Sequence, residues 1–205
     1  MNSHLKSVYL RELARQCQFA LFALGHLNVA LTNLSGPSGM QAQTEIFLAL
    51  HSFLAHASNA SRILWPPRVR KRKGESDECF VIRKTATDER GRVLRDSVGL
   101  DDSSILKDRS LRDHLEHFDE RIAEWHETSE RKNYVQDMIA SPNAIVGIDP
   151  GDAMRWFDPH TKAYLFRGAR YDMQGLASAV DALLPTATNA ADKAWREGIP
   201  RPRVS

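Results

Sequence analysis

The sequence predicts a mainly α-helical protein, an up-and-down helical bundle with a small late β-hairpin and a C-terminal helix. Two observations support this fold class: apolar residues recur at steps of three and four along most of the chain, and strand-type patterns appear only after residue 143. At 205 residues we expect one domain, with a helical core over 3–130 and the hairpin and last helix over 144–197.

Two long helices are expected to open the chain. The first covers 3–34, and the Gly- and Pro-containing segment 35–39 ends it. The second covers 41–64 and stops at Trp65, because the two prolines that follow disfavour helical backbone and supply no N–H. These helices form the base of the predicted bundle.

The middle of the chain carries more charge. The basic run from Arg68 to Lys73 is expected to form an exposed loop, and a short helix is expected over 89–97. A longer helix is predicted over 103–129, because one narrow apolar stripe runs through an otherwise charged segment. The stripe consists of Leu111, Leu115, Phe118, Ile122 and Trp125.

The last part of the chain has a different pattern. Residues 144–148 are expected to form a strand, and 154–157 with 163–167 a β-hairpin. A final helix is expected to begin near Leu176 and to continue past Pro185 to about Glu197. The tail around 200–203 is expected to be disordered.

Composition and charge limit the classes of function. The formal net charge is only +2, so nucleic-acid binding would have to come from a local patch. Cys17 and Cys79 have no CxxC or metal-type spacing, which indicates a reducing compartment. Because no signal peptide and no membrane-length apolar run is present, we expect a cytoplasmic protein that does not bind membranes.

The most informative segment is Arg112-Asp113-His114-Leu115-Glu116-His117, which places Arg, Asp and His beside the apolar stripe. Here the sequence resembles the HEPN superfamily, helical-bundle proteins with an Arg-x4–6-His motif whose arginine is often followed by Asn, Asp or His. The resemblance covers roughly residues 5–128.

The resemblance implies metal-independent RNA cleavage by a homodimer, in which the Arg–His pairs of two protomers line one cleft. It implies no cofactor, and a toxin–antitoxin or phage-defence setting with an antitoxin or inhibitor protein as a partner. In chemical terms His117 would take a proton from an RNA 2′-hydroxyl, Arg112 would stabilise charge on the phosphate, and Asp113 would orient the pair.

The Arg-x4-His spacing is not unique to this segment. The same Arg-x4-His spacing occurs at 109/114, 121/126 and 155/160. Residues five apart also lie about 140° apart around a straight helix. Arg112 and His117 therefore converge only through the long arginine side chain, a bend in the helix or a partner protomer.

Other interpretations remain open. The basic run could hold a phosphate backbone, although it contains no interleaved aromatics that would stack on bases; its cations are Arg68, Arg70, Lys71, Arg72 and Lys73. The chain could instead be a non-catalytic dimerisation or binding module, with His114 at the edge of the core. A third hypothesis is a metal-dependent bundle hydrolase that joins His51 or His56 to His114 or His117, although no metal-binding motif is present.

Overall fold

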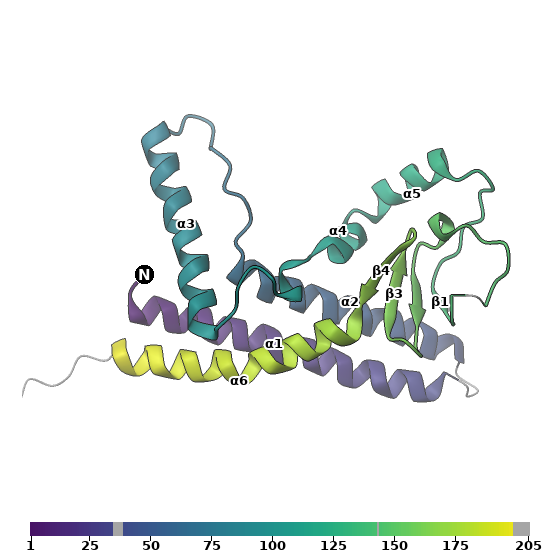
Figure 1. Ribbon diagram of the computed structural model, residues 1–205, viewed down its shortest axis with the longest axis horizontal. Helices are drawn as coiled ribbons and strands as arrows, with labels where there is room; N and C mark the ends of the chain where they lie inside the picture. The colour runs from purple at the N-terminus through teal and green to yellow at the C-terminus, as the bar shows by residue number, and fades with distance from the viewer. Residues whose placement is uncertain (35–38, 143, 199–205) are drawn as a thin grey trace, which may run out of the picture.

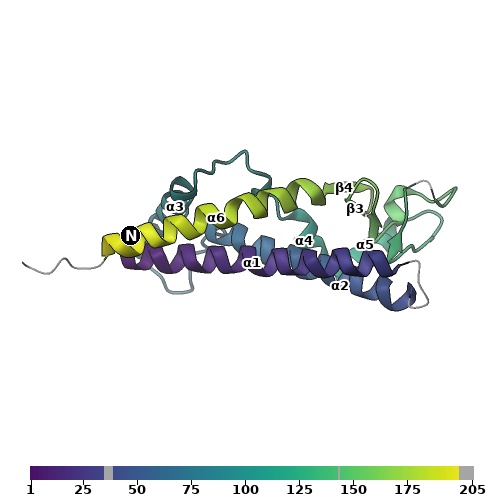
Figure 2. The same ribbon diagram turned by 90° about the horizontal axis from the view of Figure 1, so that it is seen from below.

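The computed structural model describes residues 1–34, 39–142 and 144–198, and it confirms a mainly helical fold (Figure 1). Three long helices form the central layer: α1 (Ser3–Asn33), α2 (Gly39–Leu64) and α6 (Met173–Gly198). α1 lies between the other two and runs antiparallel to both (Figures 1 and 2). Among the described residues, no helix is long and apolar enough to cross a bilayer.

Apolar stripes from the three helices meet in one core. Each buried leucine contributes about 1.5–3 kcal/mol, so burial is the main term that holds the layer together. Small side chains on α6 allow it to lie close to α1. Buried members of the core include Leu10, Leu13, Cys17, Ile46, Leu50, Phe53, Val180, Ala187 and Ala191.

The two N-terminal helices and the last helix agree with the sequence prediction. The Asn2 side chain accepts a hydrogen bond from Leu5 N at 2.8 Å and so starts α1. α6 begins three residues earlier than predicted, because Asp172 Oδ1 accepts from Gly175 N at 2.8 Å, and it continues past Pro185 as expected. The predicted turn at 35–38 and the tail at 200–203 lie outside the described residues.

The short helix predicted over 89–97 is in fact α3 (Asp77–Val98), a helix more than twice as long. Ser76 Oγ caps it by accepting from Cys79 N at 3.2 Å, and Gly99 ends it at φ 68°. The sequence pattern missed its first half because that half projects away from the bundle and buries no apolar residue (Figure 1).

The continuous helix predicted over 103–129 is wrong. The segment folds as η1 (Ile105–Lys107), α4 (Ser110–Glu116) and α5 (Phe118–Thr128). A turn separates the first two, because Asp108 Oδ1 accepts from Ser110 N at 2.9 Å. The second break lies at His117, whose backbone leaves the helical region at φ −103° and ψ 38°.

A four-stranded sheet packs beside α2 and α5. Its strands are β1 (Met138–Ile139), β2 (Trp156–Asp158), β3 (Ala163–Phe166) and β4 (Ala169–Asp172), in that order across the sheet. The β2–β3 pair is the predicted hairpin, with Trp156 opposite Leu165, and β1 pairs parallel to β2.

Two details of the sheet differ from the prediction. The strand expected over 144–148 is wrong: these residues form bends and turns, and Val146 is 96% exposed. β4 was not predicted, because its residues are mostly exposed and show no alternating apolar pattern. Backbone pairing to β3 through the tight turn at Arg167 and Gly168, both at positive φ, forms this strand instead.

Candidate functional site

The predicted catalytic residues lie on α4 and at the break that follows it. The Arg112 side chain is only 15% exposed and forms an ion pair with Glu116. Asp113 is exposed. The His117 side chain is 57% exposed, and its Nδ1 lies 3.4 Å from Glu120 Oε1. Arg112 and His117 therefore each contact a different glutamate, on either side of the break.

Arg112 belongs to a cluster of three arginines from two helices. Arg62, at the end of α2, places Nη2 3.9 Å from Glu116 Oε2, the same oxygen that pairs with Arg112. Burial lowers the pKa of Arg112, and the charges of Arg62 and Arg109 lower it further. Arg109 also donates to the Trp65 carbonyl at 3.1 Å. Two guanidinium groups thus share the Glu116 carboxylate and the charge of a third, Arg109, acts on Arg112, so positive charge gathers here and favours a bound anion.

Sequence reasoning missed Arg62. It lies fifty positions before Arg112, at the end of a helix whose other charged residue is Glu45. Only the packing of α4 on α2 brings Arg62 to Glu116. A basic residue in the last turn of a helix is an ordinary stabilising feature, so its position alone gave no functional signal.

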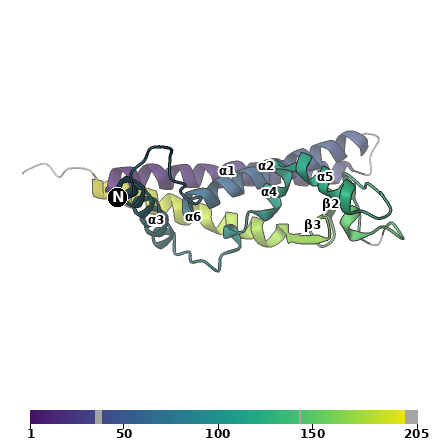
Figure 3. The same ribbon diagram turned by 90° about the horizontal axis from the view of Figure 1, so that it is seen from above.

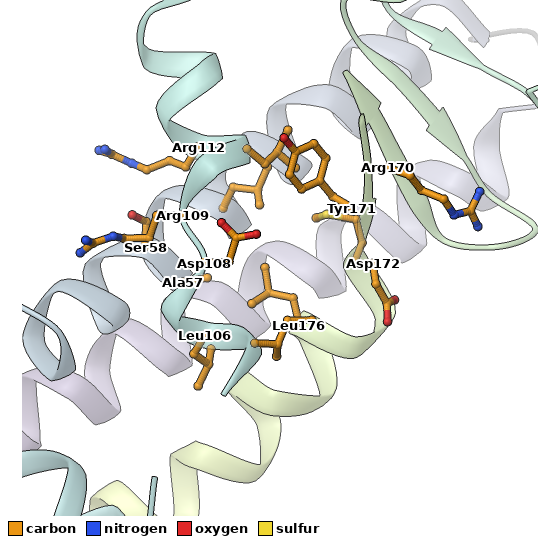
Figure 4. A pocket seen from close by; sticks show the side chains of 14 residues that line it. Ala57, Ser58, Leu106, Asp108, Arg109, Arg112, Arg170, Tyr171, Asp172 and Leu176 are labelled. Atoms are coloured by element: carbon orange, nitrogen blue, oxygen red, sulfur yellow. The ribbon is translucent and has the colours of Figure 1, made fainter. Parts of the chain in front are cut away.

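A cavity of about 130 Å³ lies beside this cluster, between α2, η1, α4, β4 and α6. Its wall is mainly apolar, with Leu106 and Leu176 among the lining residues. Figure 4 shows the Asp108 carboxylate pointing into the space, whereas the guanidinium groups of Arg109 and Arg112 point away from it. The lining of the cavity therefore does not suit an anion, and the guanidinium groups of Arg109 and Arg112 lie outside it.

The predicted basic run is an exposed loop, as expected. It lies against α3, at the far end of the molecule from α5 (Figures 1 and 3). Lys71 Nζ pairs with Asp77 at 2.6 Å, and Arg83 donates to the Arg70 carbonyl at 2.9 Å. An open groove of about 760 Å³ runs along the loop, and α3 adds Phe80 and Lys84 to its lining. Packing thus supplies the aromatic ring that the basic run itself lacks.

His114 lies at the edge of the core. Its ring stacks on Phe166 with centroids 5.1 Å apart and an interplanar angle of 11°. Burial lowers the pKa of His114, and the nearby charges of Arg121 and Arg167 lower it further. Arg167 pairs with Glu124 at 2.7 Å and so ties the β3–β4 turn to α5.

A second polar cluster joins α2, α5 and the sheet. Arg155 Nη2 donates to Asp137 Oδ2 at 2.9 Å, and its Nε lies 2.8 Å from Oδ1. The guanidinium also lies over the Phe118 ring, 4.8 Å from its centroid. Gln43 of α2 donates to the Asp137 carbonyl, which holds that residue at a positive φ of 59°. The cluster connects three elements through one partly buried ion pair.

His51 and Tyr164 lie near Arg155 in the same cluster. Tyr164 is fully buried, and neither its hydroxyl nor His51 Nε2 has a hydrogen-bond partner among the described residues. Burial lowers the pKa of His51 to about 4, with a smaller contribution from the Arg155 charge. Burial also raises the pKa of Tyr164. Both groups are therefore neutral at pH 7.

The predicted histidine grouping for a metal is not assembled. His51 lies near Arg155, His56 Nδ1 lies 2.9 Å from Gln16 Oε1, and His114 stacks on Phe166. Across residues 1–34, 39–142 and 144–198, no three His, Cys, Asp or Glu side chains gather where they could hold a metal ion.

The lowered pKa of His51 gives the protein a pH-dependent stability. Between about pH 6.5 and 4 the unfolded chain takes up a proton at His51 and the folded chain does not, so stability is lost as the pH falls through this window. Since the ring is only partly buried, we expect a loss of about 2 kcal/mol from this residue. Urea unfolding of His51→Gln at pH 7.5 and 4.5 should show a correspondingly smaller pH effect. His126→Gln, which removes an exposed imidazole, is the control. If the free energy of unfolding fell by the same amount between pH 7.5 and 4.5 in all three proteins, the assignment would be contradicted.

Comparisons with known proteins add no assignment: no family model, curated protein or solved structure matches this chain. The arginine cluster and the exposed His117 that follows α4 are the groups in this region that could act on a substrate.

Proposed function

We propose that this protein is a HEPN-like, metal-independent endoribonuclease, with His117 as general base, Arg112 as the phosphate-stabilising group and Asp113 as an orienting group. The observation that carries the proposal is the arginine cluster. Arg62 and Arg112 share the Glu116 carboxylate, one residue before an exposed imidazole, and the charge of Arg109 also acts on Arg112. Positive charge beside an accessible base suits a phosphodiester with a neighbouring hydroxyl.

The break at His117 supports this assignment. On a straight helix, residues 112 and 117 diverge by about 140°. Here the helix ends at Glu116 and a new one begins at Phe118, so the direction of His117 is not fixed by the axis of α4. A bend in the helix is one of the three ways in which Arg112 and His117 were expected to converge.

The proposed reaction needs no metal. His117 takes the proton from a ribose 2′-hydroxyl, and the 2′-oxygen attacks its own phosphorus. The bond from phosphorus to the 5′-oxygen breaks, the leaving oxygen takes a proton from water, and a 2′,3′-cyclic phosphate remains. Arg112 exchanges Glu116 for the phosphate oxygens and stabilises their growing charge. DNA lacks the 2′-hydroxyl and is not cleaved.

The groove along α3 supports RNA as the substrate. Arg68, Arg70, Lys71 and Lys84 supply cations to a hollow that also contains the Phe80 ring. Cations that follow a backbone beside an aromatic platform are typical of single-strand binding. In this proposal the groove holds RNA outside the reacting nucleotides.

The test is cleavage of single-stranded RNA in EDTA. We expect wild-type protein to cut RNA but not DNA of the same sequence, and His117→Ala to be slower by about 10²–10⁴-fold. His126→Ala is a matched control, because His126 is also exposed and also follows an arginine by five positions. Cleavage by His117→Ala at the wild-type rate, or no cleavage by the wild type, would overturn the proposal.

A non-catalytic helical binding module is the second candidate. The outer face of α1 and α2, which is nearly free of charge between Gln16 and Ser61, favours it. The same cleavage assay separates the two candidates, because a non-catalytic binding module would not cleave RNA.

A further inference from the structure

The hairpin of α1 and α2 is nearly free of charge. From Gln16 to Ser61 the chain contains one residue of the Asp, Glu, Lys and Arg group, Glu45, although such residues make up 26% of the whole sequence. A surface helix of an isolated protein normally presents charged residues on its outer face. The outer face of this hairpin therefore differs from the rest of the surface.

Apolar side chains are exposed on that face. Phe22 is 72% exposed and Leu48 is 69% exposed, and Phe19 and Val29 are also exposed. Positions 19, 22 and 29 share one side of α1. The Phe19 ring contacts His56 of α2, with centroids 5.1 Å apart, so the face spans both helices. Figure 2 shows α1 at the front, with part of α2 beside it.

The composition of the face indicates a protein interface. The cores of protein–protein interfaces are depleted in charged residues and enriched in Phe and Met, and large exposed apolar patches mark interaction sites. A helix that binds an anionic membrane surface instead carries many Lys and Arg residues along its polar side. Here the charged residues that flank the patch are Arg15 and Glu45, one of each sign.

These two charges are placed symmetrically. Arg15 is two helical turns before Phe22 on α1. Phe19 lies beside His56, and Glu45 is eleven residues before His56 on an antiparallel helix, so Glu45 is level with Ala30. At 1.5 Å per residue, Arg15 and Glu45 lie about 11 Å to either side of Phe22 along the helix axis.

We propose that a second copy of this chain binds this face, around a two-fold axis near Phe22. The axis brings Arg15 opposite the partner's Glu45, and Glu45 opposite the partner's Arg15, so the face is self-complementary. A patch two helices wide covers roughly 25 Å by 20 Å. Two copies would then bury about 1,000 Å² in total, which reaches the lower limit of a specific interface.

The dimer keeps the two arginine clusters apart. α4 packs on the side of α2 away from α1 (Figures 1 and 3), so Arg112, which lies on α4, is not part of the paired face. This arrangement differs from the shared cleft that the resemblance implies. The inference is independent of the proposed ribonuclease, since a dimer can form whether or not RNA is cleaved.

Sedimentation of the full chain tests the proposal. We expect the wild type to sediment at twice the 23.1 kDa chain mass, and Phe22→Glu to sediment as a monomer with unchanged helical circular dichroism. Ile82→Glu, which changes an exposed apolar residue of α3, is the matched control and should remain a dimer. A monomeric wild type, or a Phe22→Glu variant that still dimerises, would overturn the proposal.

A charge exchange tests the identity of the partner. Arg15→Glu alone is expected to raise the dimer dissociation constant about tenfold, because two ion pairs become two repulsions. The double variant Arg15→Glu with Glu45→Arg should return the constant to about the wild-type value. A double variant as weak as the single one would show that Arg15 does not face Glu45 and would overturn the two-fold arrangement.

Discussion

Substitution of Arg112 by alanine is expected to slow RNA cleavage by about 10³–10⁵-fold, which is the effect of removing an arginine that stabilises a phosphoryl transition state. The Arg112 guanidinium lies in the first turn of α4 and pairs closely with Glu116, whereas Arg62 reaches the same oxygen only at 3.9 Å, so we expect Arg62 not to replace its paired donors. Arg112→Lys retains the charge without the planar donor fork and should recover only a small part of the rate. Single-turnover cleavage at saturating RNA measures the chemical step directly.

The variant Glu116→Gln tests whether Arg112 acts on the phosphate or only stabilises the fold. Glu116 holds both Arg62 and Arg112, so a phosphate must compete with it for Arg112. We therefore expect Glu116→Gln to bind RNA more tightly than the wild type. If Arg112 served only as a structural partner of Glu116, both Arg112→Ala and Glu116→Gln would lower stability and leave cleavage unchanged. Arg92→Ala, which removes an exposed arginine of α3, is the control for loss of positive charge.

Much of the fold was predictable because long helices repeat one pattern many times. α1 and α2 each bury a continuous stripe, and Pro66 marks the end of α2 in the sequence itself. The β2–β3 hairpin was also predictable, because its turn contains Asp158, whose carboxylate accepts from His160 N at 3.0 Å. Local chemistry is sufficient where a segment determines its own conformation.

The remaining elements depend on distant partners. The first half of α3 buries nothing, so its helix has no apolar pattern to detect. Strand β4 exists because β3 offers hydrogen bonds to its backbone, which its side chains do not encode. The core was predicted over 3–130, yet α6 lies along α1 as part of the central layer.

The candidate site was predicted in part. The sequence identified Arg112, Asp113 and His117 from one motif, and all three lie on or beside α4. It gave no sign of Arg62, which joins the site only through Glu116. A local motif can name the residues of one helix, but the charge that surrounds them comes from packing.

Substitution of Arg155 by alanine is expected to lower the free energy of unfolding by about 3 kcal/mol, the largest stability effect we expect for a single charged residue here. Arg155 is 19% exposed and makes a two-point contact with Asp137. Its removal leaves a half-buried carboxylate unpaired, and burial already raises the pKa of Asp137. Urea unfolding at pH 7 measures the loss, and Arg92→Ala should have a much smaller effect because its ion pairs are exposed.

A double substitution tests whether loss of the Arg155–Asp137 ion pair causes the lower stability of Arg155→Ala. In Arg155→Ala with Asp137→Asn, the neutral amide no longer leaves a buried charge, so part of the stability lost in Arg155→Ala should return. The Gln43 contact to the Asp137 carbonyl is a backbone interaction, and it is retained in both variants. If the double variant were no more stable than Arg155→Ala, the main role of Arg155 would be its contact with the Phe118 ring. The sheet would then be joined to α5 by packing on that ring and not by the ion pair.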